Sequence, residues 1–428
     1  MAAVNMDASV TCEETEPVKV GVVFPTKPEN KDCVISEDGR TLIYTSAKNR
    51  ETQTFSFDQV VNVDNVQSFH SELLPSVTDS VSRGLIVSLL VCGVCSEEMC
   101  ILIDHSIIKQ LLADLFSRLL SRVKEEPFIS VSFIQFYPDG SAVDLLSPER
   151  QTLKPVTHPV LGRLIEGVCE VCVATAEDAC DLYETGRKTL RTRARDVYGR
   201  CSSLFSVAVE WKLHGETGEE KEKEEEEEEV CRSRLQLFSL AGRASRTDLR
   251  GVNPLVTVLE ELPHVAPSAE RFLPGLLHEA LTGNSKTFLI YCFNPQGILD
   301  VETPTALALA QKVRCLTTRA TVGRWCPRAT ETESRQKIMD LQAVMMSLGE
   351  SDVDHTHRLA ELNQNLQMVK NQSWERRREE SKRLKKKCLT PPHSSVPSRE
   401  GRAESHRLKC LQDQLRVEME RHIRGNVV

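Results

Sequence analysis

The sequence predicts an α/β fold in which a central, mostly parallel sheet is flanked by helices and followed by a helical C-terminal extension. Two short and almost continuous apolar runs, Ile86–Val91 and Phe288–Phe293, are typical of strands buried on both faces. The stretch Ile107–Val123 carries apolar residues at three- and four-residue steps, which predicts an amphipathic helix. Because strands buried on both faces need helices to cover them, the two patterns together favour a layered α/β domain.

Length and charge limit the class of protein. A chain of 428 residues suits two or three domains, or one large α/β head with extensions. The formal net charge is −8 and the basic residues lack interleaved aromatics, so we expect no nucleic-acid partner. No signal peptide is evident, and no apolar stretch approaches the roughly 20 residues that span a membrane. We therefore expect a cytoplasmic protein without a transmembrane segment.

Fifteen cysteines are scattered through the chain. In a reducing compartment we expect most of them to be buried or inert thiols, without structural disulfides. Two C-x-x-C pairs, Cys92/Cys95 and Cys169/Cys172, are compatible with a zinc site. The second pair lies in an apolar run typical of a strand, which would point its two thiols to opposite faces. We favour unliganded thiols over zinc and expect no metal.

Residues 93–100 stand at the end of a predicted strand, where a phosphate-binding loop would read G-x-x-x-x-G-K-[ST]. Gly93 is retained, and Glu98, Met99 and Cys100 replace the second glycine, the lysine and the hydroxyl, with Ser96 and Glu97 before them. One cation is lost and two carboxylates are gained, which disfavours phosphate. The carboxylates would instead stabilise the first turn of a following helix.

Further segments accompany this degenerate loop in a fixed order. They are Val18–Phe24, Phe55–Val61, Gly84–Gly93, Val131–Tyr137 with Val143–Leu146, Leu240–Gly242, Leu276–Thr287 and Glu302–Val313. Each resembles a landmark of the kinesin motor domain, and Leu276–Thr287 is close to the family pattern L-L-x-D-S-L-G-G-N-x-x-T. The alternative is an unrelated α/β protein, since apolar runs bounded by turn residues are common. The shared order favours the resemblance, which implies a P-loop NTPase fold like that of kinesin heads.

The resemblance implies an ATP site whose positions can be compared one by one. At the adenine-binding R-x-R-P segment this chain has Val23–Thr26, without arginine. The first switch, N-x-x-S-S-R-S-H, keeps only Arg200 in register. In the second switch, D-L-A-G-S-E, Ser239 replaces the aspartate, Gly242 is retained, and Ala244 replaces the glutamate that would pair with the arginine. We therefore expect no catalytic residue and no cofactor, with ATP and Mg²⁺ implied only if the protein is a motor.

The resemblance also implies a microtubule-binding face at the family segment P-Y-R-D-S-K-L-T. Pro267–Pro274 stands there, with Ala269 and Phe272 in place of an arginine and a lysine, and Arg271 one position away. Because the surface of tubulin is acidic, the lost cations would weaken both steering and affinity.

The chain divides by composition into a flexible N-terminus (1–16), a kinesin-motor-like domain (17–322), a helical region with a short coiled coil (331–389), a linker (390–402) and an amphipathic helix (403–424). Within the head, residues 215–231 include six consecutive glutamates and predict an acidic, disordered insertion between two strands. A decoy for basic partners is the alternative to this solvated loop.

Apolar residues recur at helical spacing in the region 331–389. They are Ile338, Leu341, Val344 and Met345 in one run and Leu359, Leu362, Leu366 and Val369 in the next. The second run is typical of a coiled-coil seam but covers under two heptads. Self-association, a helical protein partner and a helix folded against the head all remain open.

The region ends in a strongly basic segment. Its cations, all candidates for partner binding, are Arg376, Arg377, Arg378, Lys382, Arg383, Lys385, Lys386 and Lys387. Acidic tubulin tails, an anionic membrane surface or solvent alone would each suit such a segment.

Three functions follow from these patterns. The first is a kinesin-like, non-motile cytoskeletal adaptor or scaffold that associates with microtubules and whose head is incompetent for nucleotide. The second is an ATP-dependent microtubule motor. The third is a protein-interaction scaffold that does not bind tubulin. The first agrees best with the replaced nucleotide residues.

Overall fold

The computed structural model describes residues 14–24, 33–46, 50–62, 66–93, 105–123, 126–147, 153–193, 201–213, 229–242, 244, 252–262, 272–292, 302–348 and 353–389. The chain forms two units, residues 1–385 and 386–428. The second unit contributes just the last turn of a helix to the described residues.

A single large sheet forms the centre of the first unit. Its strands lie in the order β12 (Val171–Cys172), β8 (Phe128–Phe136), β13 (Ser202–Leu213), β14 (Glu229–Leu240), β7 (Ile86–Gly93), β15 (Lys286–Cys292), β2 (Lys19–Phe24) and β6 (Gln59–Asn62). The five strands from β14 to β6 run parallel, and β13, β8 and β12 extend the sheet in antiparallel pairing. The predicted α/β architecture with a central, mostly parallel sheet is confirmed.

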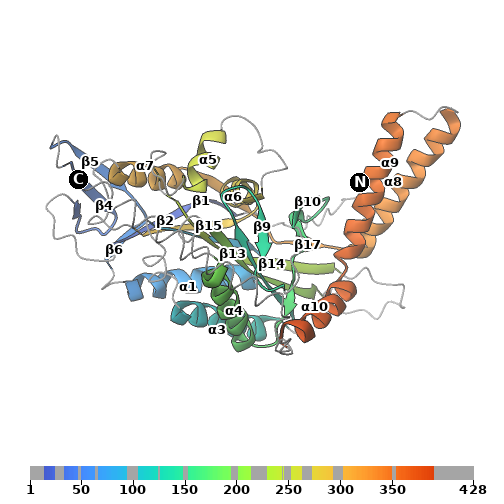
Figure 1. The fold of residues 1–428 in the computed structure, drawn as a ribbon, viewed down its shortest axis with the longest axis horizontal. Helices are drawn as coiled ribbons and strands as arrows, with labels where there is room; N and C mark the ends of the chain where they lie inside the picture. The colour runs from blue at the N-terminus through green and yellow to red at the C-terminus, as the bar shows by residue number, and fades with distance from the viewer. Residues whose placement is uncertain are drawn as a thin grey trace, which may run out of the picture. The chain divides into compact units, whose positions relative to one another are not determined.

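Helices cover both faces of this sheet (Figure 1). On one face lie α1 (Val66–Ser82), α3 (His105–Arg122) and α4 (Ala176–Arg193), and on the other lie α5 (Pro254–Glu261), α6 (Phe272–Thr282) and α7 (Glu302–Arg314). The two apolar runs singled out in the sequence are the buried strands β7 and β15, and the predicted helix at 107–123 is α3. None of the described helices combines the length and apolar character that crossing a bilayer requires.

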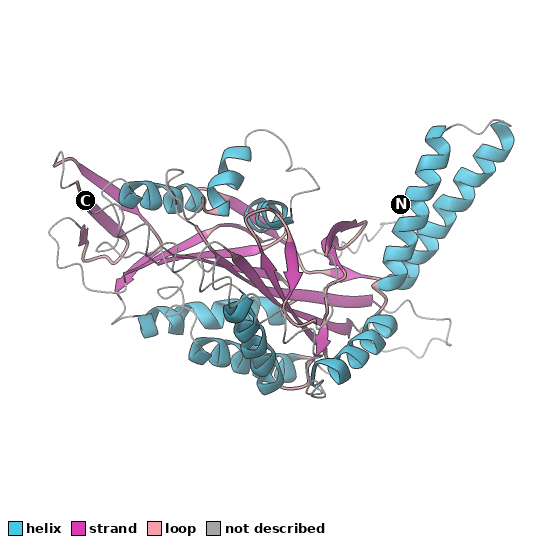
Figure 2. Ribbon diagram, in the orientation of Figure 1, coloured by secondary structure: helices cyan, strands magenta, loops and turns pink. Residues whose placement is uncertain are grey.

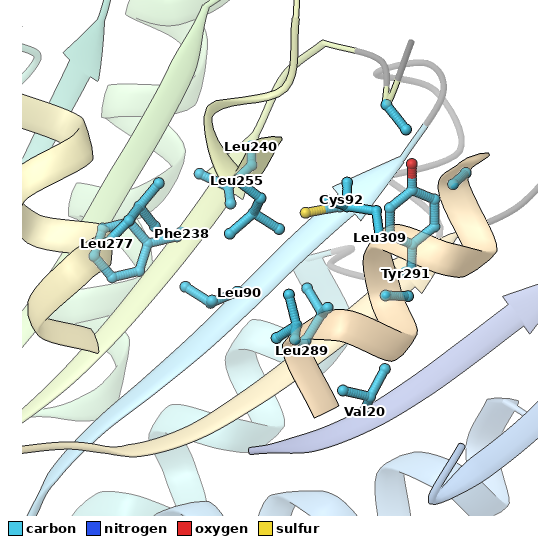
Figure 3. Packing of buried hydrophobic residues seen from close by; sticks show 14 of the residues in the cluster. Val20, Leu90, Cys92, Phe238, Leu240, Leu255, Leu277, Leu289, Tyr291 and Leu309 are labelled. Atoms are coloured by element: carbon cyan, nitrogen blue, oxygen red, sulfur yellow. The ribbon is translucent and has the colours of Figure 1, made fainter. Parts of the chain in front are cut away.

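The main hydrophobic core lies between the sheet and α5, α6 and α7. Figure 3 shows Leu90 of β7 and Leu289 of β15 beneath Leu255 of α5 and Leu277 of α6, and all four side chains are at most 1% exposed. Burying one such leucine contributes about 1.5–3 kcal/mol. The alternation along β7 sends the next side chains to the opposite face, so the strand is apolar on both sides.

The segment that most resembled the kinesin pattern ties three elements together at the amino edge of the sheet. Ser285 Oγ donates to Ser88 Oγ at 2.8 Å, and Ser88 Oγ donates in turn to Gln236 Oε1 at 3.1 Å. Asn284 Oδ1 accepts from the backbone N–H of Thr321 at 2.8 Å. These bonds satisfy hydroxyls that would otherwise be buried without partners.

The start of the chain is more ordered than the predicted flexible N-terminus of residues 1–16. Residues 1–13 lie outside the described residues, but β1 (Glu14–Pro17) pairs antiparallel with β16 (Thr317–Ala320). Glu16 also accepts an ion pair from the mostly buried Lys286, with Nζ 3.3 Å from Oε2. A pairing between segments 300 residues apart leaves no local pattern in the sequence.

Smaller elements surround the sheet. They are the three-stranded sheet of β3 (Cys33–Ile35), β4 (Thr41–Thr45) and β5 (Thr52–Ser56), the hairpin of β10 (Lys154–His158) and β11 (Gly162–Glu166), and the short strands β9 (Ala142–Asp144) and β17 (Arg324–Trp325), which pair with β8 and β14. The β13–β14 hairpin flanks the predicted acidic insertion, whose residues 215–228 lie outside the described part and whose last residues begin β14.

Three helices follow the head. Figures 1 and 2 show α8 (Pro327–Leu348) and α9 (Val353–Asn371) side by side, and α10 (Trp374–Leu389) continues beyond them. Val369, from the predicted coiled-coil seam, is 1% exposed and belongs to a second core with Trp374 of α10 and Phe128 of β8. Residues 331–385 thus belong to the same unit as the head, and α8 and α9 pack on each other within one chain. The linker at 390–402 and the helix at 403–424 lie outside the described residues.

Two adjacent leucines of α3 allow the contribution of the core to be measured. Leu119 is fully buried, whereas Leu120 is 69% exposed. We expect Leu119→Ala to lower the free energy of unfolding by about 2–5 kcal/mol, because it leaves a cavity, and Leu120→Ala to change it by less than about 0.5 kcal/mol. Urea denaturation of the two variants tests this, and equal effects would contradict the described packing of α3.

Candidate functional site

The candidate site lies at the carboxyl edge of the parallel strands, where open α/β sheets bind ligands. The last residues of β2, β7, β14 and β15 are Phe24, Gly93, Leu240 and Cys292. All four are buried and none carries a charge. The described strand ends therefore offer neither a cation for phosphate nor a carboxylate for a metal ion.

The segment predicted to be a degenerate phosphate loop follows β7 in the sequence. Gly93 ends the strand, while Ser96, Glu97, Glu98, Met99 and Cys100 lie outside the described residues, as does Arg200 of the first switch. The side chain of Cys92, one residue before Gly93, points toward Leu255 in Figure 3. Burial raises the pKa of its thiol to about 12, against an opposing hydrogen bond with the Asn253 side chain. Cys92 is therefore a neutral thiol within the core.

The turn after β14 keeps the glycine of the second switch for a local steric reason. Gly242 has φ +98°, and a Cβ at this position would stand 2.8 Å from the backbone of Val252 and Asn253. The preceding Ala241 N–H donates to Ser202 Oγ at 3.1 Å. Close approach of two backbone segments therefore requires glycine here whether or not nucleotide binds.

The other second-switch positions carry small side chains. Ala244 is 5% exposed and belongs to the main hydrophobic core, so a glutamate there would place a carboxylate among apolar groups. Ser239 lies in β14, half-buried, beside Val91 of the parallel strand β7. Val23 and Phe24, at the adenine-binding positions, are fully buried in β2. Phe272, at a cation position of the predicted microtubule face, is buried at the start of α6, with its ring 6.3 Å from that of Phe136.

Asn253 is a site residue that sequence reasoning missed. Its side-chain Oδ1 accepts from the Leu255 N–H at 2.9 Å and caps α5, with Pro254 at the first helical position. Its Nδ2 donates to the Gly242 carbonyl at 3.5 Å, so the same side chain links the turn after β14 to the helix. The dipeptide Asn-Pro before an apolar run was the available signal for this cap.

The metal prediction concerned two cysteine pairs. Cys95 lies outside the described residues, Cys169 precedes β12, and Cys172 lies within it. The cysteines that the structure describes are free thiols, and no group of three potential ligands gathers among the described residues.

The basic segment forms α10, and it does not present all of its cations to solvent. Arg377 is 5% exposed and ion-pairs with both Glu170 and Glu210, and its guanidinium lies 5.5 Å from the centre of the Phe128 ring. Glu210 also pairs with Arg232 of the neighbouring strand, with Nε 3.0 Å from Oε1. Arg377 is thus corrected from a candidate partner-binding cation to a buried anchor, because a buried carboxylate such as Glu210 requires a cation.

The remaining cations of α10 are placed differently. Arg376, Lys382 and Arg383 are exposed, and Arg378 is half-buried with its guanidinium 5.9 Å from the centre of the Trp374 ring. The side chains of Lys385, Lys386 and Lys387 lie outside the described part of the helix. The opposite, anchored face carries Trp374 and Ser381, whose Oγ donates to the Glu170 carbonyl at 2.6 Å.

The charge balance around Glu170 shows how strongly α10 is held. Burial alone would raise the pKa of Glu170, but the guanidinium groups of Arg377, Arg232 and Arg234 outweigh it and lower the pKa to about 2. Glu170 therefore remains ionised in the folded protein well below neutral pH. An unpatterned glutamate within the apolar strand Ser202–Leu213, which is Glu210, was the sequence signal for this buried network.

Comparison with protein families settles the class of the head. A model of the kinesin motor domain matches residues 25–316, more than half of the chain. The chain belongs to the kinesin family. The predicted membership is therefore confirmed.

Individual proteins that are similar to this chain are also kinesin-like proteins. The chain is 26% identical over 276 residues to human kinesin-like protein KIF1C, covering 58% of this chain and 24% of that protein. It is 25% identical over 348 residues to kinesin-like protein bimC of Emericella nidulans, covering 71% and 28%. To kinesin-like protein unc-104 of Caenorhabditis elegans it is 25% identical over 280 residues, covering 58% and 17%. The matched part thus spans about a quarter or less of these relatives.

Solved kinesin structures share the fold. A fast kinesin superposes with a TM-score of 0.60 at 20% identity, covering 72% of this chain and 94% of that one. A KIF14 dimer, solved with AMP-PNP in complex with a microtubule, superposes with a TM-score of 0.58 at 21% identity, covering 72% and 97%. The kinesin motor fold is thereby shown for the head.

The steric role of Gly242 is testable against a second glycine. Gly140 also has a positive φ, +87°, but a Cβ there would meet nothing within 4 Å. We expect Gly140→Ala to cost about 1–2 kcal/mol from backbone strain alone, and Gly242→Ala to cost about 1–3 kcal/mol more because of the clash with residues 252 and 253. Denaturant unfolding measures both, and equal costs would show that the turn after β14 tolerates a side chain.

The anchoring of α10 predicts a contrast between two adjacent arginines. We expect Arg377→Met to lower the free energy of unfolding by about 3–5 kcal/mol, because it removes the buried cation that Glu170 and Glu210 share, and Arg376→Met to change it by less than about 1 kcal/mol. Because the folded pKa of Glu170 lies below its usual 4.5, its stabilising contribution is present above pH 4.5 and is lost as the pH falls toward 2. Unfolding curves at pH 7, 4 and 3 should therefore converge for the wild type and Arg377→Met. A constant difference across this range would contradict the ion pair.

Proposed function

We propose that this kinesin-family protein is a non-motile, microtubule-associated adaptor whose head does not use ATP. The observation that carries the proposal is the apolar carboxyl edge, where Phe24, Gly93, Leu240 and Cys292 end the parallel strands and Ala244 is buried behind them. A nucleotide site needs charged and hydroxyl groups at such an edge. The absence of charge at these four described strand ends supports the proposal.

Electrostatics supports the loss of nucleotide binding. A pair of unit charges at about 4 Å is worth about 1 kcal/mol in water and about 4 kcal/mol at an effective dielectric constant near 20. Replacement of the loop lysine by Met99, together with Glu97 and Glu98, removes one attraction to phosphate and adds two repulsions. Several such changes together lower affinity by orders of magnitude, so we expect neither ATP nor Mg²⁺ as a cofactor.

The outer face of α10 supports binding to an acidic surface. Arg376, Lys382 and Arg383 are exposed, while Arg377 holds the helix against the sheet. A related kinesin structure was determined in complex with a microtubule, which makes tubulin the partner to test first and the cytoskeleton the expected location. Exposed cations favour association with acidic partners at low salt and lose effect as salt increases.

A second candidate, an interaction scaffold without tubulin contact, is favoured by α8. Met339, Val344 and Met346 are 53%, 44% and 83% exposed on this helix, although α9 packs along it. Exposed apolar side chains on one helix are typical of docking sites for another helix. In this hypothesis the head is only a platform for α8 and α9.

Microtubule co-pelleting of the full chain tests the proposal. We expect binding to be equal without nucleotide, with a non-hydrolysable ATP analogue and with ADP, because the head does not respond to nucleotide. The triple variant Arg376→Ala, Lys382→Ala, Arg383→Ala should bind about tenfold more weakly. A matched variant, Arg328→Ala, Arg335→Ala, Lys337→Ala, removes three exposed cations from α8 and should bind like the wild type.

Two outcomes would overturn the proposal. Release from microtubules by ADP, or binding of Mg-ATP at micromolar concentration in calorimetry, would make the protein a motor. Absence of any pelleting at low salt would favour the scaffold without tubulin contact.

A further inference from the structure

A cavity at the amino edge of the sheet is separate from the nucleotide position. It has a volume of about 100 Å³ and lies between the β10–β11 hairpin, α6 and the starts of β7 and β14. Its charged lining residues are Arg163, Arg232, Arg234, Arg324 and Glu279. Because β7 and β14 run parallel, this edge is opposite the one where the degenerate phosphate loop begins. Nothing in the proposed function uses it.

The charges around the cavity do not balance. Arg232 pairs with Glu210, and Arg377 pairs with Glu170 and Glu210, so two arginines already engage two carboxylates. Arg234 makes only a long ion pair with Glu170, with Nη2 3.9 Å from Oε1.

The remaining acid near the cavity is Glu279, which faces both Arg163 and Arg234. Burial raises the pKa of Glu279, and the opposing effect of these two arginines does not cancel the increase. The raised pKa makes Glu279 a weaker counter-ion for the arginines. The connected set therefore contains four arginines and three glutamates, and the excess cation is largely shielded from water.

One guanidinium nitrogen of Arg163 is left without a hydrogen-bond partner. This Nη1 atom is buried and donates to no acceptor among the described residues, and the nearby Ser233 Oγ also lacks a hydrogen-bond partner there. The guanidinium lies against Gly275 in the first turns of α6, where a Cβ would overlap Nη1. Glycine is a poor helix former, so its presence here is explained by the room that it leaves for Arg163.

We propose that this cavity binds a small oxyanion, the phosphate or carboxylate group of a metabolite, with Arg163 and Arg234 as its cationic ligands and Ser233 as a hydrogen-bond donor. Guanidinium groups bind both kinds of oxyanion through paired N–H donors. The volume corresponds to about three water molecules, which suits such a group. The apolar lining residues Ile86, Leu161 and Leu276 leave space for a short carbon chain beside the oxyanion.

The test measures melting of the full chain with sodium phosphate, glycerol phosphate and sodium acetate, each against sodium chloride at equal ionic strength. We expect at least one of the three to raise Tm above the sodium chloride control, by about 2–4 °C per tenfold increase in concentration once the concentration exceeds its Kd. A larger effect of acetate would indicate a carboxylate, a larger effect of phosphate would indicate the free ion, and a larger effect of glycerol phosphate would indicate a phosphomonoester.

Variants separate the site from general salt effects. Arg163→Gln removes the cation, and Gly275→Ala displaces it without removing its charge, so both should abolish the shift beyond the sodium chloride control. Arg40→Gln removes an exposed arginine elsewhere and should leave the shift unchanged. Circular dichroism identifies a temperature at which each variant is folded. Calorimetric titration at that temperature then distinguishes loss of binding from loss of stability. Absence of any shift beyond the sodium chloride control, or an equal shift in Arg163→Gln, would overturn the proposal.

Discussion

Burial of β7 on both faces is the constraint on which the rest of this molecule depends. A strand with apolar side chains in both directions must lie between other strands and beneath helices on both sides, and β14, β15, α1 and α6 meet that need. The parallel arrangement then brings the carboxyl ends of the strands to one edge. The described residues at that edge, among them Phe24, Leu240 and Ala244, belong to the main hydrophobic core.

Local patterns were enough to predict most of this core, because hydrophobic periodicity is a property of neighbouring residues. The strands at 86–93 and 286–292 and the helix at 105–122 follow directly from their apolar spacing. The loss of charge at Ser239 and Ala244 was also visible in the sequence. What could not be predicted were contacts between distant segments, such as the pairing of Glu14–Pro17 with β16 and the burial of Arg377. Arginine is usually exposed, and it is buried when a carboxylate neutralises it. The sequence alone does not show which distant carboxylate lies beside Arg377.

The network around Glu210 joins the head to its C-terminal helices. This glutamate is 2% exposed, and cations from both β14 and α10 reach it. Buried ion pairs often add little net stability, since desolvation offsets attraction, but they discriminate strongly against arrangements that leave one partner alone. The network therefore specifies where α10 docks more than how firmly the head folds. It also places the exposed cations of α10 on the side away from the sheet.

The β13–β14 hairpin has a practical consequence for anyone who modifies this protein. Its long ladder holds Leu213 opposite Glu229, so the two ends of the intervening acidic segment are fixed as direct partners. The entropic cost of closing a loop between fixed ends increases only with the logarithm of its length, by about 0.6 kcal/mol per doubling. A fluorescent domain or an affinity tag could therefore replace that segment with little penalty to the sheet. The hairpin is a natural point of attachment for a reporter within the chain.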